Sequence, residues 1–216
     1  ESPTDFSTAA IIVNPGDTIL LEAGTYKFRS RINLYQKGTP EKRITLKPEI
    51  DGSKVILDFS SQEFLSTNRG IQLSGNSWNI YGIDVTGAGD NGLYICGNYN
   101  IIENCQFYKN RDSGLQLGRG ASSQTTVDLW PSNNLIRNCT SFNNYDDETL
   151  GENADGFAAK LTVGYGNVFD GCIAFRNSDD GWDLYGKEDS GNIGHVILYN
   201  CVAFENGFLP ESHESN

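Results

Sequence analysis

The sequence predicts an all-β solenoid in which short parallel strands stack coil upon coil. A high content of Gly (24 residues) and the absence of Met indicate many tight turns and leave little room for long amphipathic helices. Two interleaved sequence repeats supply the periodicity of a solenoid. Because one such repeat cannot bury its apolar face alone, successive repeats must stack on one another. We expect residues 1–216 to form a single domain of this kind.

The expected domain has three parts along the chain. Residues 1–60 contain an N-terminal cap and the first coils, residues 71–208 the regular coils, and residues 209–216 a tail. Within the first part we expect a turn-strand-turn at 14–26, strands at 44–47 and 55–58, and a short terminal cap at 8–13.

The charge balance excludes some classes of partner. With 28 acidic and 16 basic residues the chain has a net charge of −12, so nucleic acid is excluded because phosphate binding needs a basic surface. No run of about 18 apolar residues exists, so we expect no membrane span. An acidic polysaccharide would be repelled unless bound cations or local basic residues reverse the field at its site.

The first repeat has the form Cys-x-x-aromatic-x-Asn. Stacked coils would place its cysteines, aromatic rings and asparagines in internal ladders along the solenoid axis. Asn amides can hydrogen-bond both the turn backbone and one another. One Cys per coil favours small apolar core residues over disulfide bonds, and no Cys-x-x-Cys spacing supports a zinc site. The copies of this repeat begin at Cys105, Cys139, Cys172 and Cys201.

The second repeat is a turn that ends in Gly followed by an apolar residue. The shortest interval between copies is the 22 residues from Gly92 to Gly114. Insertions at 118–131 and 145–152 explain the longer intervals. The copies of the turn are Asp90-Asn91-Gly92, Asp112-Ser113-Gly114, Ala154-Asp155-Gly156 and Asp179-Asp180-Gly181.

The last two copies of this turn predict a metal site. Their alignment places Asp155 on Asp180 in adjacent coils, about 4.8 Å apart. Carboxylates that close repel unless a cation lies between them or one of them is protonated. Hard oxygen ligands suit Ca²⁺, which takes roughly 6–8 of them. Asp179 shares its column with Asp90 and Asp112, so a turn-forming role also fits it.

Several segments resemble a known family of enzymes. Residues 15–26 are similar to the first coil of many pectin-lyase-like right-handed β-helices, and residues 153–160 and 178–185 look like those of pectate lyases of polysaccharide lyase family 9. The resemblance covers essentially the whole chain. It implies a right-handed parallel β-helix with Asn, Cys and aromatic ladders.

The resemblance also implies an activity and a set of ligands. It implies Ca²⁺-dependent cleavage of polygalacturonate, or pectin, by β-elimination in a secreted protein whose signal peptide is not in the supplied chain. We further expect a monomer. The resemblance implies ligation of Ca²⁺ by Asp155, Asp179, Asp180 and Asp183.

The catalytic base is not recognisable in the sequence. In the resembled family it is a lysine on a later coil, in an Asn-Gly-Phe-Lys-like turn, whereas Asn206-Gly207-Phe208-Leu209 has no lysine. We therefore expect the base to lie beyond the supplied chain. Lys160, Lys187 and Arg119 are the candidates for binding uronate carboxylates, and for the two lysines the alternatives are acting as the base or being a solvated charge.

Two other functions stay open. An inverting polygalacturonase would use Asp155 and the Asp179-Asp180 pair as acid and base about 6.5–9.5 Å apart, although its Gly-His-Gly and Arg-Ile-Lys motifs are absent. The other alternative is a Ca²⁺-dependent pectin-binding or structural module without catalysis. Phe157 and Trp182 are expected in the core, and His195 in a structural role.

Overall fold

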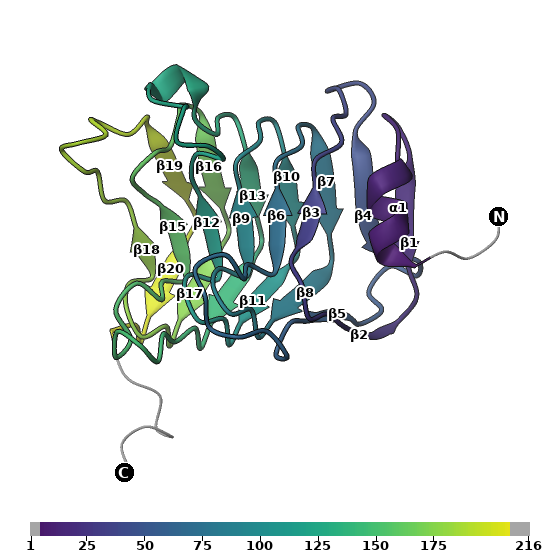
Figure 1. Ribbon diagram of the computed structural model, residues 1–216, viewed down its shortest axis with the longest axis horizontal. Helices are drawn as coiled ribbons and strands as arrows, with labels where there is room; N and C mark the ends of the chain where they lie inside the picture. Colours follow the sequence, from purple (N-terminus) through teal and green to yellow (C-terminus); the bar gives the residue numbers. More distant parts are fainter. Residues whose placement is uncertain (1–4, 208–216) are drawn as a thin grey trace, which may run out of the picture.

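The computed structural model describes residues 5–207 of the chain. Figure 1 shows a right-handed parallel β-helix with helix α1 (Phe6–Ile12) across its N-terminal end. Every strand pair is parallel and in register, which confirms the predicted solenoid. The predicted tail at 209–216 lies outside the described residues. No helix in the described part of the chain is long and apolar enough to cross a membrane.

Three parallel sheets run along the solenoid, and in the described residues two of them have seven strands and the third has six. The first sheet contains β1 (Thr18–Leu21), β4 (Ile44–Pro48), β7 (Trp78–Tyr81), β10 (Ile101–Glu103), β13 (Leu135–Arg137), β16 (Asn167–Asp170) and β19 (Val196–Tyr199). The second contains β2 (Gly24–Lys27), β5 (Val55–Asp58), β8 (Ile83–Thr86), β11 (Gln106–Tyr108), β14 (Thr140–Phe142), β17 (Ile173–Phe175) and β20 (Val202–Phe204). The third contains β3 (Ile32–Leu34), β6 (Ile71–Leu73), β9 (Leu93–Ile95), β12 (Leu115–Leu117), β15 (Phe157–Ala159) and β18 (Trp182–Asp183).

The core is built by the alternation of side chains along each strand. In β4, for example, Ile44 and Leu46 point inward and are fully buried, while Thr45 and Lys47 face outward. The predicted N-terminal strands are present as β1, β4 and β5, whereas the turn expected after β1 is followed directly by a further strand, β2.

Helix α1 closes the N-terminal end of the core. The Asp5 carboxylate caps it by accepting hydrogen bonds from the Thr8 backbone N–H at 2.9 Å and the Thr8 hydroxyl at 2.6 Å. Phe6 and Ala10 are buried. The predicted cap is therefore a helix that begins earlier than expected.

An asparagine ladder links the coils, as the first repeat predicts. Each amide nitrogen donates to the amide oxygen of the next coil, at 3.0 Å from Asn110 to Asn144, 2.8 Å from Asn144 to Asn177 and 2.9 Å from Asn177 to Asn206. A second ladder, which the sequence analysis missed, joins Asn100 to Asn134 and Asn134 to Asn167. Both ladders satisfy buried polar groups that would otherwise destabilise the core.

The cysteines behave as core residues, as predicted. All five are free thiols, and Cys105, Cys139 and Cys172 are buried, so the disulfide alternative is wrong. The expectation that the aromatic ladder is internal is also wrong. Tyr108 and Phe142 stack at 5.0 Å on the outer face of the second sheet, because Phe107 and Ser141 take the inward positions.

Asn144→Ala tests the ladder. The substitution leaves the Asn110 backbone N–H and amide without their acceptor, and it also removes the bond to Ser141 Oγ. Unsatisfied buried donors cost about 1–3 kcal/mol each, so we expect a loss of roughly 2–4 kcal/mol in the free energy of unfolding. Urea denaturation measures this loss. The exposed Asn192→Ala is the control and should cost less than about 0.5 kcal/mol; equal effects would contradict a ladder role.

Candidate metal and substrate site

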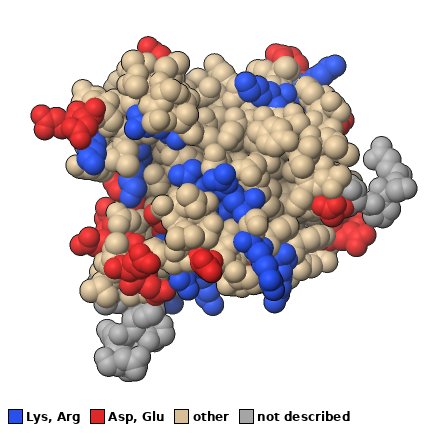
Figure 2. Space-filling view, viewed as in Figure 1, with Lys and Arg blue, Asp and Glu red and all other residues tan. Residues whose placement is uncertain are grey.

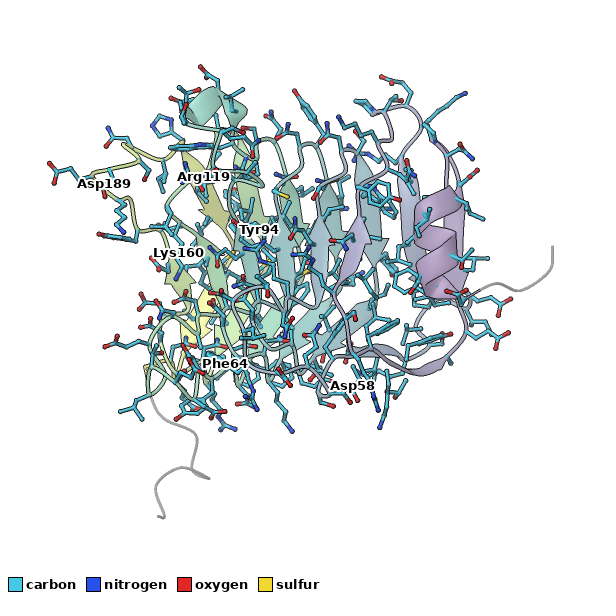
Figure 3. The ribbon with its side chains drawn as sticks, in the orientation of Figure 1. Asp58, Phe64, Tyr94, Arg119, Lys160 and Asp189 are labelled. Carbon is cyan, nitrogen blue, oxygen red and sulfur yellow. The ribbon has the colours of Figure 1, made fainter. Side chains whose placement is uncertain are left out.

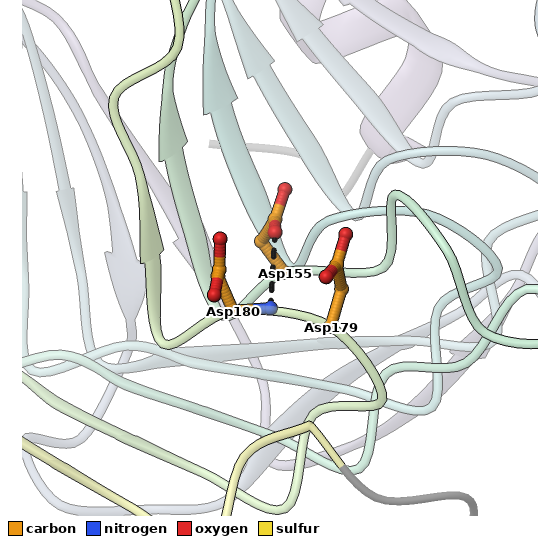
Figure 4. Close-up of side chains that lie close together, drawn as sticks. All are labelled: Asp155, Asp179 and Asp180. Atoms are coloured by element: carbon orange, nitrogen blue, oxygen red, sulfur yellow. Dashed lines mark hydrogen bonds between the residues drawn. The ribbon is translucent and has the colours of Figure 1, made fainter.

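The predicted aspartates lie where the chain enters the third sheet. Phe157 pairs with Trp182 in β15 and β18, so Asp155 lies one coil from Asp180, as the repeat predicts. The Gly156 N–H donates to the Asp180 carbonyl at 2.8 Å, and the Asp180 N–H donates to Asp155 Oδ1 at 3.2 Å (Figure 4).

The glycine of this turn is required by the Asn ladder behind it. A Cβ at Gly156 would lie 2.7 Å from the Ala174 Cβ and 2.8 Å from the Asn177 amide nitrogen. No other residue allows the turn to pack this closely. The asparagine ladder and the acidic turns are thus built on the same contact.

Three of the four predicted ligands converge. One carboxylate oxygen from each of Asp155, Asp179 and Asp180 lies within 4.8 Å of the others. Asp155 is buried, Asp179 is half-buried and Asp180 is exposed, so a cation could enter from solvent. This donor set of hard oxygens fits Ca²⁺, whose remaining positions water or a substrate carboxylate would fill. Asp179 Oδ2 also accepts the backbone N–H of Asn153 on the preceding coil at 2.9 Å, so its carboxylate links two coils.

Lys160 joins the fourth predicted ligand to the cluster. Its ammonium lies 2.8 Å from Asp155 Oδ2 and 2.9 Å from Asp183 Oδ2. The Lys160 side chain is only 10% exposed, and Asp155 Oδ2 also accepts the Ser113 hydroxyl at 2.9 Å. Asp183 is therefore held by an internal cation and lies outside the group of three. These contacts favour a positioning role for Lys160 over the predicted binding of substrate.

Burial and charge shift the pKa values of Asp155 and Lys160 in opposite directions. Burial raises the pKa of Asp155 to about 7, although Lys160 opposes the shift. Burial alone would lower the pKa of Lys160, but Asp155 and Asp183 outweigh it and hold that pKa above its ordinary value. We therefore regard Lys160 as a stable ammonium.

The other predicted residues lie outside the group of three carboxylates. Arg119 follows β12, and its backbone N–H donates to Thr162 Oγ1 at 3.0 Å. Lys187 is exposed in the loop after β18. Phe157 is fully buried and stacks on the half-buried Trp182 at 5.0 Å, as expected for core residues. His195 lies just before β19 rather than within a strand, exposed beside the Tyr165 ring.

A second set of charged side chains on the third sheet was not predicted. The Arg69 guanidinium lies over the Tyr94 ring, and Arg69 Nε is 3.3 Å from Asp90 Oδ2. Burial, and then the nearby Asp112, raise the pKa of Asp90 to about 7, with Arg69 opposing. In the sequence, the Asp90 and Asp112 pair could be found only because the two residues align in the second repeat. No sequence pattern pointed to Arg69.

Comparison with known proteins identifies the family. A family model described as "Pel9A-like, right handed beta helix region" matches residues 1–216. The chain belongs to this family.

The relatives of this Pel9A-like chain are named as pectate lyases. It is 51% identical over 197 residues to pectate lyase L of Paenibacillus polymyxa (strain SC2), covering 90% of this chain and 43% of the relative. It is 47% identical over 215 residues to pectate lyase L of Thermoclostridium stercorarium, covering 98% of this chain and 17% of the relative. The crystal structure of pectate lyase Pel9A superposes with a TM-score of 0.85 at 32% identity, covering 99% of this chain and 51% of that one. The chain thus spans less than half the length of the first two relatives.

Lys160→Met tests the internal cation of the Pel9A-like site. Removing it leaves Asp155 buried without its charged partner, which typically costs about 3–5 kcal/mol in the free energy of unfolding. Urea denaturation in metal-free buffer measures the loss, and adding Asp155→Asn should recover part of it. Lys187→Met is the matched control, with an expected change within about 0.5 kcal/mol. A similar loss in both lysine variants would contradict the positioning role.

Asp90→Asn tests the second carboxylate pair through the pH dependence of stability. The folded protein keeps a proton on Asp90 up to about pH 7, whereas the unfolded chain loses it near the ordinary value of 3.8. The folded state therefore binds more protons between these values, and the free energy of unfolding falls as pH rises through them. Between pH 4.5 and pH 8, the free energy of unfolding should fall by about 1–3 kcal/mol less in the variant than in the unmodified protein, as measured by denaturation at both pH values. The exposed Asp189→Asn should leave the fall unchanged, and an unaltered Asp90→Asn profile would refute the assignment.

Proposed function

We propose that this chain is the Ca²⁺- and polygalacturonate-binding part of a pectate lyase. The observation that carries the proposal is the convergence of the Asp155, Asp179 and Asp180 carboxylates within 4.8 Å beside the Lys160 ammonium. The relatives are named as pectate lyases, which supports a pectate substrate for this chain. A secreted protein that meets pectin outside the cell fits this activity.

The reaction would be a β-elimination on a uronate unit. A proton leaves C5, a C4–C5 double bond forms, and the C4–O bond breaks. Bound Ca²⁺ would supply charge neutralisation of the uronate carboxylate, which makes the C5 proton more acidic. The carboxylates of Asp155, Asp179 and Asp180 would hold the ion, while Lys160 would keep Asp155 and Asp183 in place.

Lys160 is a poor candidate for the base. A general base must be unprotonated and within reach of the proton that it takes. The Lys160 ammonium is instead held by carboxylates at 2.8 and 2.9 Å, which keep its pKa above the ordinary value. We keep the base on a lysine beyond residues 1–216, as the family resemblance implies, and we propose that Arg119 and Lys187 meet uronate carboxylates beside the metal.

The geometry disfavours the hydrolase alternative. An inverting glycosidase needs carboxyl groups roughly 6.5–9.5 Å apart so that a water molecule fits between sugar and base. The three aspartates instead bring oxygens within 4.8 Å, a separation that suits a shared cation. Asp155, the buried member, is also tied to Lys160 and is not free to shuttle a proton.

Ca²⁺ titration of the Asp180→Asn variant tests the metal site. Asp180 is exposed, so the substitution should leave the fold intact. Loss of one carboxylate ligand should weaken Ca²⁺ binding by at least about tenfold in isothermal titration calorimetry. Asp189→Asn, an exposed aspartate in the loop after β18, is the matched control and should bind Ca²⁺ as the unmodified chain does. Equal affinity of all three proteins would overturn the assignment.

Incubation with polygalacturonate distinguishes the enzymatic alternatives. Elimination gives unsaturated products that absorb near-ultraviolet light, whereas hydrolysis gives none. We expect Ca²⁺-dependent absorbance from this region when it is joined to the residues that carry the base. Cleavage that persists with a chelator would contradict the lyase. Calcium-dependent retention of polygalacturonate without products, even in that longer protein, would favour the non-catalytic binding module.

A further inference from the structure

Arg69 is held rigidly on the outer face of the third sheet. Its guanidinium carbon lies 3.4 Å from the centroid of the Tyr94 ring. Its Nε lies 3.3 Å from Asp90 Oδ2, and its Nη1 donates to Gln72 Oε1 at 3.0 Å. The side chain is 22% exposed, and the hydrogen bonds that hold it use Nε and Nη1. A guanidinium already fixed in this way loses little conformational entropy when it binds an anion.

Arg69 and the acidic cluster share one face of the solenoid. Tyr94 pairs with Gln116, Gln116 with Ala158, and Ala158 with Asp183, so one outward column runs from Tyr94 to Asp183. Three inter-strand steps separate β9 from β18, a distance of roughly 14 Å at about 4.8 Å per step. A polysaccharide chain that lies along the solenoid axis would span this distance with a few sugar units.

Side-chain contacts continue across the face between the two positions. The Tyr94 hydroxyl donates to the Arg119 carbonyl at 3.1 Å, and the Arg119 N–H donates to Thr162 Oγ1 at 3.0 Å. Thr162 follows Lys160 closely in the chain. Figure 3 shows Tyr94, Arg119 and Lys160 on the same face. The turn at Gly118 is constrained by this arrangement, because a Cβ there would lie 2.3 Å from the Tyr94 hydroxyl.

The charge on this face differs from that of the whole protein. Although the net charge is −12, Lys and Arg side chains cross the middle of the face, and Asp and Glu gather toward β15 and β18 (Figure 2). Asp90 compensates Arg69 only in part around neutral pH, because burial and then Asp112 raise the Asp90 pKa to about 7. A local positive strip of this kind attracts a polyanion that the rest of the surface repels.

We propose that Arg69, stacked on Tyr94, binds the carboxylate of a uronate unit several sugars away from the unit at the aspartate cluster. The inference rests on the proposed function, since it assigns to the same polysaccharide a second point of attachment. A planar guanidinium suits a carboxylate because it donates hydrogen bonds in a fixed plane. The site lengthens the binding surface from the cluster toward the N-terminal coils.

Titration with oligogalacturonates of increasing length, in saturating Ca²⁺, tests the site. Affinity should rise once the oligomer is long enough to reach Arg69 from the cluster. Arg69→Met should lose this gain, weakening the long oligomers about tenfold while leaving short oligomers and Ca²⁺ unchanged. Arg69→Lys keeps the charge but loses the planar donor set, so an intermediate loss is expected even if Arg69→Met folds poorly. The matched control is Arg137→Met. Arg137 lies on β13 of the first sheet, away from the third sheet, and its guanidinium pairs with Glu103 of β10.

The Asp90→Asn variant should strengthen the binding of long oligomers, whereas the Arg69 variants weaken it. Asp90→Asn removes the anion that competes for Arg69, so long oligomers should bind more tightly above pH 7, which a purely structural role of Arg69 would not produce. Length-dependent binding that Arg69→Met leaves intact, or equal weakening of short and long oligomers, would overturn the inference and leave the proposed function standing. Failure of the unmodified chain to bind any oligomer with Ca²⁺ would overturn both.

Discussion

The in-register stacking of parallel coils is the constraint on which both the fold and the candidate site depend. Each residue lies directly above its equivalent at about 4.8 Å, so any side chain that recurs must tolerate a copy of itself. Amides do so by donating along the column, as from Asn144 to Asn177, and aromatic rings do so by stacking. Carboxylates cannot, because like charges at this spacing repel. A column of aspartates therefore requires positive charge nearby or a protonated member.

The chain meets this requirement differently at two places along the third sheet. At the C-terminal end, Lys160 binds both Asp155 and Asp183, and the exposed Asp180 stays open to solvent. Near the middle, Arg69 binds Asp90 while Asp112 lies in the next coil. A buried cation that leaves carboxylate oxygens exposed suits the proposed metal site, whereas a partly exposed cation suits the proposed anion site.

The sequence predicted the stacking register that the repeat determines. The Asp-Gly turns gave the correct register of Asp155 against Asp180, because only glycine fits against the Asn ladder. The second ladder also had a signal, since Asn100, Asn134 and Asn167 recur at nearly the same interval as the cysteines. The contacts of Lys160 had none, because its partners are five residues before it and 23 residues after it. The repeat also did not show which face of the second sheet carries the aromatic ladder. That face is set by the neighbouring residues Phe107 and Ser141, which take the inward positions.

A regular scaffold of this kind separates stability from recognition. The ladders and the apolar side chains act inside the coils, whereas Tyr94, Gln116, Ala158 and Asp183 occupy equivalent outward positions on successive strands. Each outward position can change without disturbing the register, because the register is held from within. A linear polymer laid along the axis would meet one such position at every step. Its affinity would then depend on which outward side chains are charged, and the sharply acidic composition of the chain need not exclude a polyanionic ligand.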